Sequence, residues 1–302
     1  LASRQKDITV QGDGGKPIFC SSFTADAPKG TVMMVHGFTE NAFKFSELIY
    51  SLLQNHFSVV AYDHRGHGRS WRDEGITDFS LTHVAKFEEY VHDLQAVCDA
   101  VLAKMPKPWM IFSHSMGGAV TGLFLEENPG VFSRAVFSSP MIEVKRNGLP
   151  YGVSKLICWI AFALGRKKKR IIMSKPYSGP EDYATASATG KERFDWYNAA
   201  KAADPALQNN GPSYGWTNQS LRVTRMLLKP GEPEKIDIPV RVYGAEWEEL
   251  VQLDAQKQFA RRLTNGTYTL LKATKHEIYR ATDAVLFPWW HEVLCFFGGE
   301  FR

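Results

Sequence analysis

Short apolar runs alternate along the chain with longer stretches in which apolar residues recur every three or four positions. The short runs predict buried strands, at residues 31–35, 58–62, 109–112, 134–138, 239–243 and 267–272. The longer stretches predict helices, at residues 43–55, 81–104, 116–127, 191–203, 252–263 and 282–297. Strands that alternate with helices need right-handed crossovers, so we expect an α/β fold with a mostly parallel central sheet flanked by helices.

Two departures from this rhythm divide the chain. At the start, two β-prone runs at residues 7–10 and 18–24 flank a glycine-rich turn and predict a hairpin. Between residues 141 and 230 the strand pattern stops and gives way to apolar, basic and Gly/Pro-rich stretches. We therefore expect a core of residues 1–140 and 231–302, with residues 141–230 inserted as a helical cap over the active site.

The composition is that of an ordinary globular protein. The chain has 302 residues, of which 44% are hydrophobic and 23% charged, and this suits one large α/β domain with an insertion. The net charge of +4 fits an affinity for anionic surfaces, but no basic stripe with interleaved aromatic residues indicates a nucleic-acid partner. The four cysteines lie far apart without a C-x-x-C pair, so we expect buried thiols in a reducing compartment.

The distribution of apolar residues also indicates where in the cell the protein is located. No apolar run reaches the ~18 residues of a membrane span, and no signal peptide opens the chain, so we expect a cytoplasmic protein. The first residue is Leu1 rather than Met. We therefore expect the chain to be trimmed at this end, which leaves open a targeting segment ahead of it.

A serine follows the apolar run at residues 109–112, within the sequence Ser-His-Ser-Met-Gly-Gly at residues 113–118. A strand that turns sharply into a helix can expose a nucleophilic serine, and only small residues fit two positions to either side. The usual pattern is G-x-S-x-G; Gly117 keeps the second glycine, while Ser113 replaces the first. We predict that Ser115 is the nucleophile, because the amino end of the following helix also favours negative charge there. The alternative is a buried strand and turn with a spectator serine.

A serine nucleophile needs a base, and the base needs a carboxylate, in the chain order serine, acid, histidine for this fold. His276 is the candidate base, because it follows the last predicted strand just before the final helix. The loop after the preceding strand holds three glutamates and no aspartate. We choose Glu248 as the acid because x-Leu-Val follows it, with Glu246 and Glu249 as fallbacks and Asp254 as a distant fourth.

An acyl-transfer site also needs two backbone N–H donors for the oxyanion. Met116, directly after the nucleophile, is the first candidate. Phe38 is the second, because it follows His36-Gly37 at the end of an early strand, where glycine lets the backbone turn inward. Two histidines in the turn at residues 63–70 could suggest a metal, but no third ligand stands at a zinc-like spacing. We expect a structural turn there, and neither metal nor cofactor.

Four motifs stand out together, at residues 35–40, 62–70, 113–118 and 275–278. With these motifs the chain resembles the lysophospholipase L2 and monoacylglycerol lipase branch of the α/β-hydrolase superfamily over nearly its whole length. Residues 211–216 and the glutamate-rich loop look more like lysophospholipase L2; Ser113 and Gln252 depart from the family pattern. The resemblance implies hydrolysis of a single-chain acyl ester, a lysophospholipid or a monoacylglycerol, through an acyl-enzyme intermediate and without a cofactor.

The predicted cap contains an apolar run at residues 156–164, followed at once by five cations at residues 166–170. An apolar segment too short to span a bilayer, next to a basic collar, has the properties of an interfacial segment. We therefore predict peripheral contact with an anionic membrane surface, at the inner face if the protein is cytoplasmic. The alternative is a cap helix packed over the core with solvated cations.

Two other functions stay open, because fold does not fix substrate. A peptidase or small-ester esterase could use the same framework, and an aminopeptidase-like cap would present carboxylates to a substrate amine. The cap has five candidates for this, Glu181, Asp182, Glu192, Asp195 and Asp204. A catalytically silent ligand-binding homologue is the other possibility. Intact Ser115 and His276 argue against it, and the unusual acid loop is the one feature in its favour.

Overall fold

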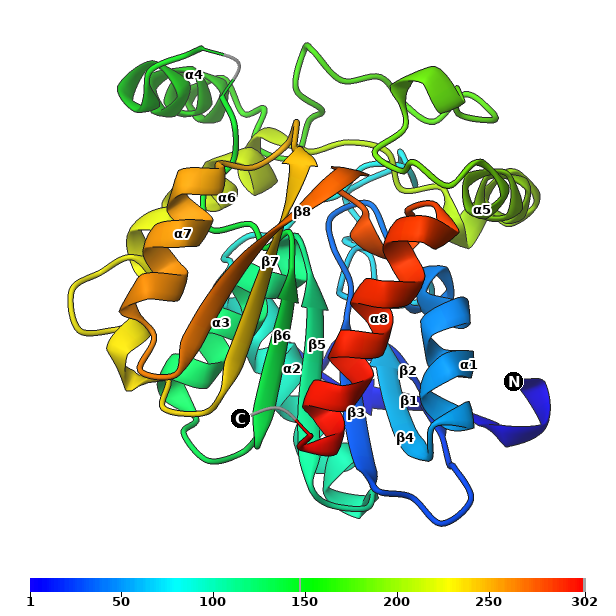
Figure 1. Ribbon diagram of the computed structural model, residues 1–302. Helices are drawn as coiled ribbons and strands as arrows, with labels where there is room; N and C mark the ends of the chain where they lie inside the picture. The colour runs from blue at the N-terminus through cyan, green and yellow to red at the C-terminus, as the bar shows by residue number, and fades with distance from the viewer. Residues whose placement is uncertain (147, 301–302) are drawn as a thin grey trace.

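Eight strands form one sheet in the computed structural model, which describes residues 1–146 and 148–300. The strands are β1 Gln5–Gln11, β2 Pro17–Phe23, β3 Gly30–Val35, β4 Phe57–Tyr62, β5 Trp109–His114, β6 Arg134–Ser138, β7 Val240–Trp247 and β8 Gly266–Lys275. The helices are α1 Ser46–Gln54, α2 Glu88–Ala100, α3 Met116–Glu127, α4 Tyr151–Ala163, α5 Lys191–Ala203, α6 Tyr214–Leu227, α7 Leu253–Arg262 and α8 Asp283–Gly298. Helices cover both faces of the sheet (Figure 1).

The sheet has the strand order β1-β2-β4-β3-β5-β6-β7-β8. β1 and β2 form an antiparallel hairpin, and β2 runs antiparallel to β4. The remaining neighbours, from β4 through β3 and β5 to β8, are all parallel. The predicted hairpin and mostly parallel sheet are therefore confirmed. Parallel strands end at one edge, and the loops that follow them meet there.

Each inner strand is apolar on both faces because a helical layer covers each face. On β3, Met33 and Val35 belong to the core under α2, α3 and α7. Their neighbours Val32 and Met34 belong to the core under α1 and α8. All six residues of β3 are buried, which explains why this strand reads as a continuous apolar run rather than an alternating one.

The predicted helix over residues 81–104 is wrong at its start, because α2 begins only at Glu88. Instead, the backbone of the preceding residues forms hydrogen bonds with residues 211–213. The Thr82 N–H donates to the carbonyl of Gly211, and the Ser213 N–H donates to the carbonyl of Thr82. Val84 is buried in this segment without being helical, so apolar spacing alone overextended the helix.

Residues 141–230, called the cap segment below, contain α4, α5 and α6. Figure 1 shows α4 and α5 on either side above the carboxyl edge of the sheet. The helix α6, which the sequence pattern did not predict, buries Val223 and Leu227 in the core with α3. The division into core and cap stays a prediction. None of the helices over residues 1–146 and 148–300 is long and apolar enough to cross a bilayer.

Candidate active site

Ser115 stands at the turn between β5 and α3 with φ 51° and ψ −118°, a conformation that is strained for a residue with a side chain. The residues around it are small because neighbouring elements press on them. A Cβ on Gly117 would lie 2.4 Å from the carbonyl oxygen of Val35. Ser113 is fully buried, and its Oγ donates to the carbonyl of Val136 over 3.3 Å. Serine therefore fits where the pattern has its first glycine.

His276 and Glu248 meet at the carboxyl edge, on the loops after β8 and β7. His276 Nδ1 lies 2.7 Å from Glu248 Oε2, and both side chains are buried. The other oxygen, Glu248 Oε1, accepts from the N–H groups of Leu250 at 2.8 Å and Val251 at 3.3 Å. Both carboxylate oxygens thus have partners, so the side chain is fixed in the orientation that holds the imidazole.

The other three candidate carboxylates lie elsewhere. β7 continues to Trp247, so Glu246 belongs to the strand and not to the loop as predicted. Its carboxylate accepts from Lys272 and from the Ala273 N–H. Glu249 is exposed. Asp254, at the start of α7, is 96% exposed and pairs with Lys257. The geometry therefore brings Glu248 alone of the four to His276.

The two partners shift each other's pKa. Burial lowers the pKa of His276, but the Glu248 carboxylate outweighs this and leaves it above 6.5. Burial raises the pKa of Glu248, but His276 and the two N–H donors leave it below its ordinary value. The Nε2 atom of His276 is buried and has no partner among the described residues. It is therefore free to accept a proton from a hydroxyl in the pocket.

The two candidate oxyanion donors are both close to the serine. Met116 is the first residue of α3. The loop carrying Phe38 is held against Ser115, since a Cβ on Gly37 would lie 3.0 Å from the Cβ of Ser115. Glu40 Oε2 fixes this loop by accepting the Gly37 N–H over 2.7 Å. Neither Phe38 nor Met116 uses its N–H on another described residue.

Ser115 and His276 open into a cavity of about 450 Å³ whose lining has two chemical characters. The apolar part includes Phe38, Met141, Val144, Phe194, Trp216, Leu250 and Val251. The charged part consists of Glu40, Lys44, Glu181, Asp182, Lys201, Glu277 and Arg280. In the apolar part, the rings of Phe38 and Trp216 lie 3.9 Å apart. The cavity can therefore receive a molecule that is apolar at one end and polar at the other.

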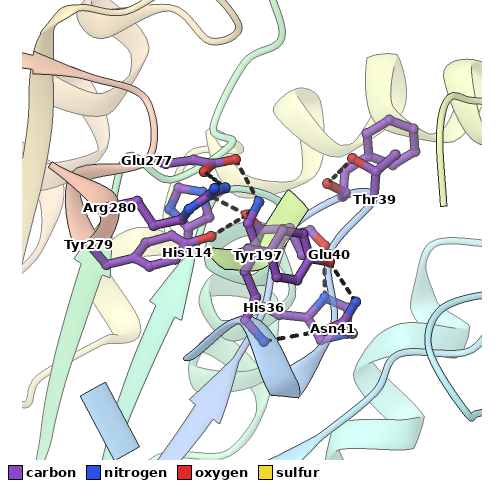
Figure 2. A network of polar contacts seen from close by, with 12 residues as sticks. His36, Thr39, Glu40, Asn41, His114, Tyr197, Glu277, Tyr279 and Arg280 are labelled. Atoms are coloured by element: carbon purple, nitrogen blue, oxygen red, sulfur yellow. Dashed lines mark hydrogen bonds and ion pairs between the residues drawn. The ribbon is translucent and has the colours of Figure 1, made fainter. Parts of the chain in front are cut away.

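A buried ionic network forms much of the charged part, and the sequence pattern did not assign it a role. Lys44 Nζ lies 2.7 Å from Glu277 Oε1 and 3.2 Å from Glu40 Oε1. The Tyr279 hydroxyl donates to Glu40 over 2.6 Å, and Arg280 donates to Glu277 over 2.6 Å (Figure 2). Burial would raise the pKa of Glu40, but Lys44 holds it at about 2. Glu40 lies ahead of the 3-10 turn Ala42–Phe45 that carries Lys44, so helical spacing in the sequence was no guide to this contact.

The histidines of the early loops are structural. The rings of His36 and His64 lie 4.5 Å apart, and the His64 N–H donates to His36 Nε2 over 2.9 Å. Burial lowers the pKa of His36, His64 and His67. Asp63 closes the turn by accepting from two backbone N–H groups. In residues 1–146 and 148–300, no three His, Cys, Asp or Glu side chains are grouped to hold a metal ion.

A family model described as serine aminopeptidase, S33, matches residues 26–283. The chain belongs to this family of α/β hydrolases. It is 27% identical over 314 residues to lysophospholipase L2 of Escherichia coli K12, covering 98% of this chain and 88% of that one. It is 28% identical over 168 residues to monoacylglycerol lipase of Mycolicibacterium smegmatis, covering 55% and 56%. The predicted resemblance to this branch is confirmed.

Solved structures agree on the fold. The chain superposes on a soluble variant of monoglyceride lipase from Saccharomyces cerevisiae with a TM-score of 0.73 at 18% identity, covering 98% of this chain and 97% of that one. A thermostable carboxyl esterase from Bacillus coagulans gives a TM-score of 0.75 at 16% identity, covering 98% of both chains. The predicted α/β-hydrolase fold is confirmed.

Proposed function

We propose that the protein is a serine hydrolase that cleaves the carboxylic ester of a single-chain lipid, a lysophospholipid or a monoacylglycerol. Ser115 Oγ attacks the ester carbonyl carbon while His276 Nε2 takes its proton, and Glu248 stabilises the resulting imidazolium. The N–H groups of Phe38 and Met116 stabilise the oxyanion, at about 3 kcal/mol for such a donor. His276 then protonates the leaving alcohol oxygen, and water releases the fatty acid from Ser115.

One observation carries this proposal: the Ser115, His276 and Glu248 arrangement opens into a cavity with an apolar and a charged part. A single-chain lipid has the matching shape, with an acyl chain for Phe38 and Trp216 and a polar head group for the ionic network. The names of the relatives, lysophospholipase L2 and monoacylglycerol lipase, support the same substrate class.

The cap segment supports a second part of the proposal, contact with an anionic membrane surface. The helix α4 stands apart from the sheet (Figure 1). It exposes Leu156 by 53% and Trp159 by 66%, whereas Cys158 and Ala161 are its buried residues. Exposing such an apolar helix face to water is unfavourable, and burying it at the lipid boundary is favourable. An enzyme that acts on a lipid would reach its substrate there.

A peptidase has weaker support from the cap carboxylates. Glu181 pairs with Lys201, Asp195 with Lys191, and Asp204 with Arg69. Asp182 accepts the Ala184 N–H and lines the cavity of Ser115, whereas Glu192 lines a separate groove beside α1. Of the five, only Asp182 lines that cavity without a cation partner among the described residues, so a substrate amine would meet one carboxylate rather than a cluster. We therefore keep the peptidase as an outcome of the test rather than as a second proposal.

The test combines active-site labelling with substrate turnover. We expect a fluorophosphonate probe to add one adduct, mapped to Ser115, and Ser115→Ala to remove both the adduct and ester turnover while circular dichroism stays unchanged. Turnover is measured on a lysophospholipid, a monoacylglycerol and an aminoacyl anilide. Near wild-type ester turnover in Ser115→Ala would refute the proposed nucleophile, and a preference for the anilide would favour a peptidase.

A further inference from the structure

Lys201 is a buried cation in the wall of the catalytic cavity. It lies on α5, its side chain is only 4% exposed, and it lines the same cavity as Ser115. Its ammonium group donates to the carbonyl of Asn209 over 2.9 Å and to the carboxylate of Glu181. The Glu181 side chain is 41% exposed. The counter-ion of this buried lysine therefore stands at the solvent edge of the cavity, where another anion could replace it.

The charged part of the cavity has hydrogen-bond donors to spare. A lysine ammonium has three donors, and Lys201 uses two of them on the partners just named. Lys44 likewise uses two, on the carboxylates of the ionic network. Arg280 adds positive charge to the same wall and uses its own donors on Glu277 and on the carbonyl of Arg193. An anionic head group with several acceptor oxygens would accept hydrogen bonds from these donors and offset their positive charge. An uncharged head group with hydroxyls would offset none of that charge.

Because Lys201 is buried, an anion beside it stabilises the charged form of its ammonium group. Taking the ammonium out of water lowers the pKa of Lys201, and Glu181 opposes this effect by its charge and its hydrogen bond. Lys44 adds further positive charge nearby, which also lowers the pKa of Lys201. A phosphate in place of the Glu181 carboxylate would keep Lys201 charged and accept hydrogen bonds that are about twice as strong as neutral ones.

We propose that Lys201 binds the phosphate of a lysophospholipid head group and so selects a phosphate-bearing ester over a monoacylglycerol. This inference rests on the proposed function, whose substrate class it narrows. The acyl ester lies at Ser115, the phosphate displaces Glu181 from Lys201, and the spare donor of Lys44 binds one of its remaining oxygens. Lys201 thus determines specificity and takes no part in the bond-breaking steps.

The experiment compares kcat/KM for 1-palmitoyl lysophosphatidylcholine and 1-palmitoylglycerol, which share one acyl chain. We expect the wild type to prefer the phospholipid. Lys201→Met should lose about tenfold or more on the phospholipid, as expected for a hydrogen bond to a charged group, and no more than about twofold on the glyceride. Lys201→Arg should keep the preference. Glu181→Gln should lower KM for the phospholipid, because it removes the anion that competes with phosphate.

Lys191→Met is the matched control, because Lys191 lies on the same helix with its side chain 54% exposed, and we expect it to leave both substrates unchanged. Equal losses on both substrates in Lys201→Met and Glu181→Gln would mean that this ion pair only supports the cap, and would overturn the inference. A wild type that labels at Ser115 but shows no preference would overturn the inference and leave the proposed function standing. Failure to label or to cleave either ester would overturn both.

Discussion

Glu248 is the carboxylate that contacts His276, although Glu246, Glu249 and Asp254 lie close to it in sequence. We expect Glu248→Gln to lower kcat by about 10³–10⁴-fold, because an amide neither stabilises the imidazolium nor holds the required tautomer. Glu246→Gln and Glu249→Gln are the matched controls and should stay within about twofold, since neither side chain contacts His276. Steady-state kinetics of the three variants on one ester measures these losses in kcat. A larger loss in Glu246→Gln or Glu249→Gln than in Glu248→Gln would mean that this other glutamate is the acid.

The same contact fixes the direction of the pH dependence. His276 must be neutral to take the proton from Ser115, and Glu248 leaves the pKa of His276 above 6.5 in spite of burial. The rate constant kcat/KM should therefore fall as the pH decreases through a value above 6.5. In Glu248→Gln the acid limb of the residual activity should move to lower pH. An acid limb that does not move would contradict the assignment of Glu248.

At the residue scale, the sequence could indicate Ser115 and His276 because each follows a recognisable strand. The choice among the glutamates depended on where β7 ends. The apolar pattern ended that strand at residue 243, whereas the backbone pairs on to Trp247 through an irregularity in register. The added residues are Gly244 and Ala245, which are buried but small, then Glu246 and the half-exposed Trp247. Such a sequence does not look like a buried strand, so no apolar pattern could have placed Glu246 in the strand.

At the scale of elements, α4 makes a prediction about membranes. Arg166, Lys167 and Lys169 take part in no ion pair within the described chain, whereas Lys168 pairs with Asp73 and Arg170 pairs with Asp78. The basic collar is therefore only partly free. We expect Lys167, Lys168 and Lys169 together changed to glutamine to weaken binding to anionic vesicles about 10- to 100-fold, at roughly 1 kcal/mol per cation near the surface.

The measurement is co-sedimentation with vesicles containing phosphatidylglycerol, repeated with neutral vesicles. The matched control changes Lys29, Lys104 and Lys107 to glutamine, which removes the same charge from exposed loops before β3 and β5, at the opposite edge of the sheet. Leu156→Ser with Trp159→Ser should weaken binding to both kinds of vesicle. Unchanged binding in the α4 variants would mean that this face has another partner.

Elements were predictable where their own residues are buried almost without interruption. The helix α3 and the strand β6 have the bounds that the sequence predicted, because α3 is buried nearly all round and β6 is buried on both faces of the sheet. The start of α2 and the whole of α6 were not predicted correctly. Both lie where the cap segment meets the core, and there the backbone and apolar side chains are satisfied by contacts distant in sequence. Local periodicity carries no information about such contacts.

For the whole molecule, buried ionisable groups set the dependence of stability on pH. Burial lowers the pKa of His36, His64, His67 and His114, and for His114 the pKa falls to about 4. Below pH 6.5 the unfolded chain therefore binds more protons than the folded one, so the free energy of unfolding falls as the pH drops. Below pH 4.5 Glu40 adds to this effect, because its pKa of about 2 favours the ionised folded form. His276 and Glu126, whose pKa values are raised in the fold, act in the opposite direction, but the four histidines outnumber these two groups.

We expect urea denaturation to show a loss of several kcal/mol in the free energy of unfolding between pH 6.5 and pH 4. His114→Asn should reduce this loss, because it removes one buried group that protonates on unfolding. A control at the exposed His56→Asn should not. Stability that is constant across this range would mean that the buried histidines are protonated in the folded state, which would contradict their packing against one another.

Above neutral pH, stability should depend on Glu126, on the buried face of α3. It is 6% exposed, its Oε1 has no partner within residues 1–146 and 148–300, and burial together with Glu232 raises its pKa to about 8, although Lys235 and Arg262 oppose this. The folded state therefore holds a proton that the unfolded state loses above pH 4.5, so this group lowers the free energy of unfolding as the pH rises to about 8, by up to roughly 4 kcal/mol.

The histidines mask this decline in the free energy of unfolding below pH 6.5. Between pH 6.5 and pH 8 we expect the free energy of unfolding of the wild type to fall by about 2 kcal/mol relative to that of Glu126→Gln, whose amide is neutral at every pH. The adjacent exposed residue gives the control, Glu127→Gln, whose curve should run parallel to that of the wild type. Parallel curves for the wild type and Glu126→Gln would mean that Glu126 is ionised in the fold, with Lys235 and Arg262 as its counter-ions.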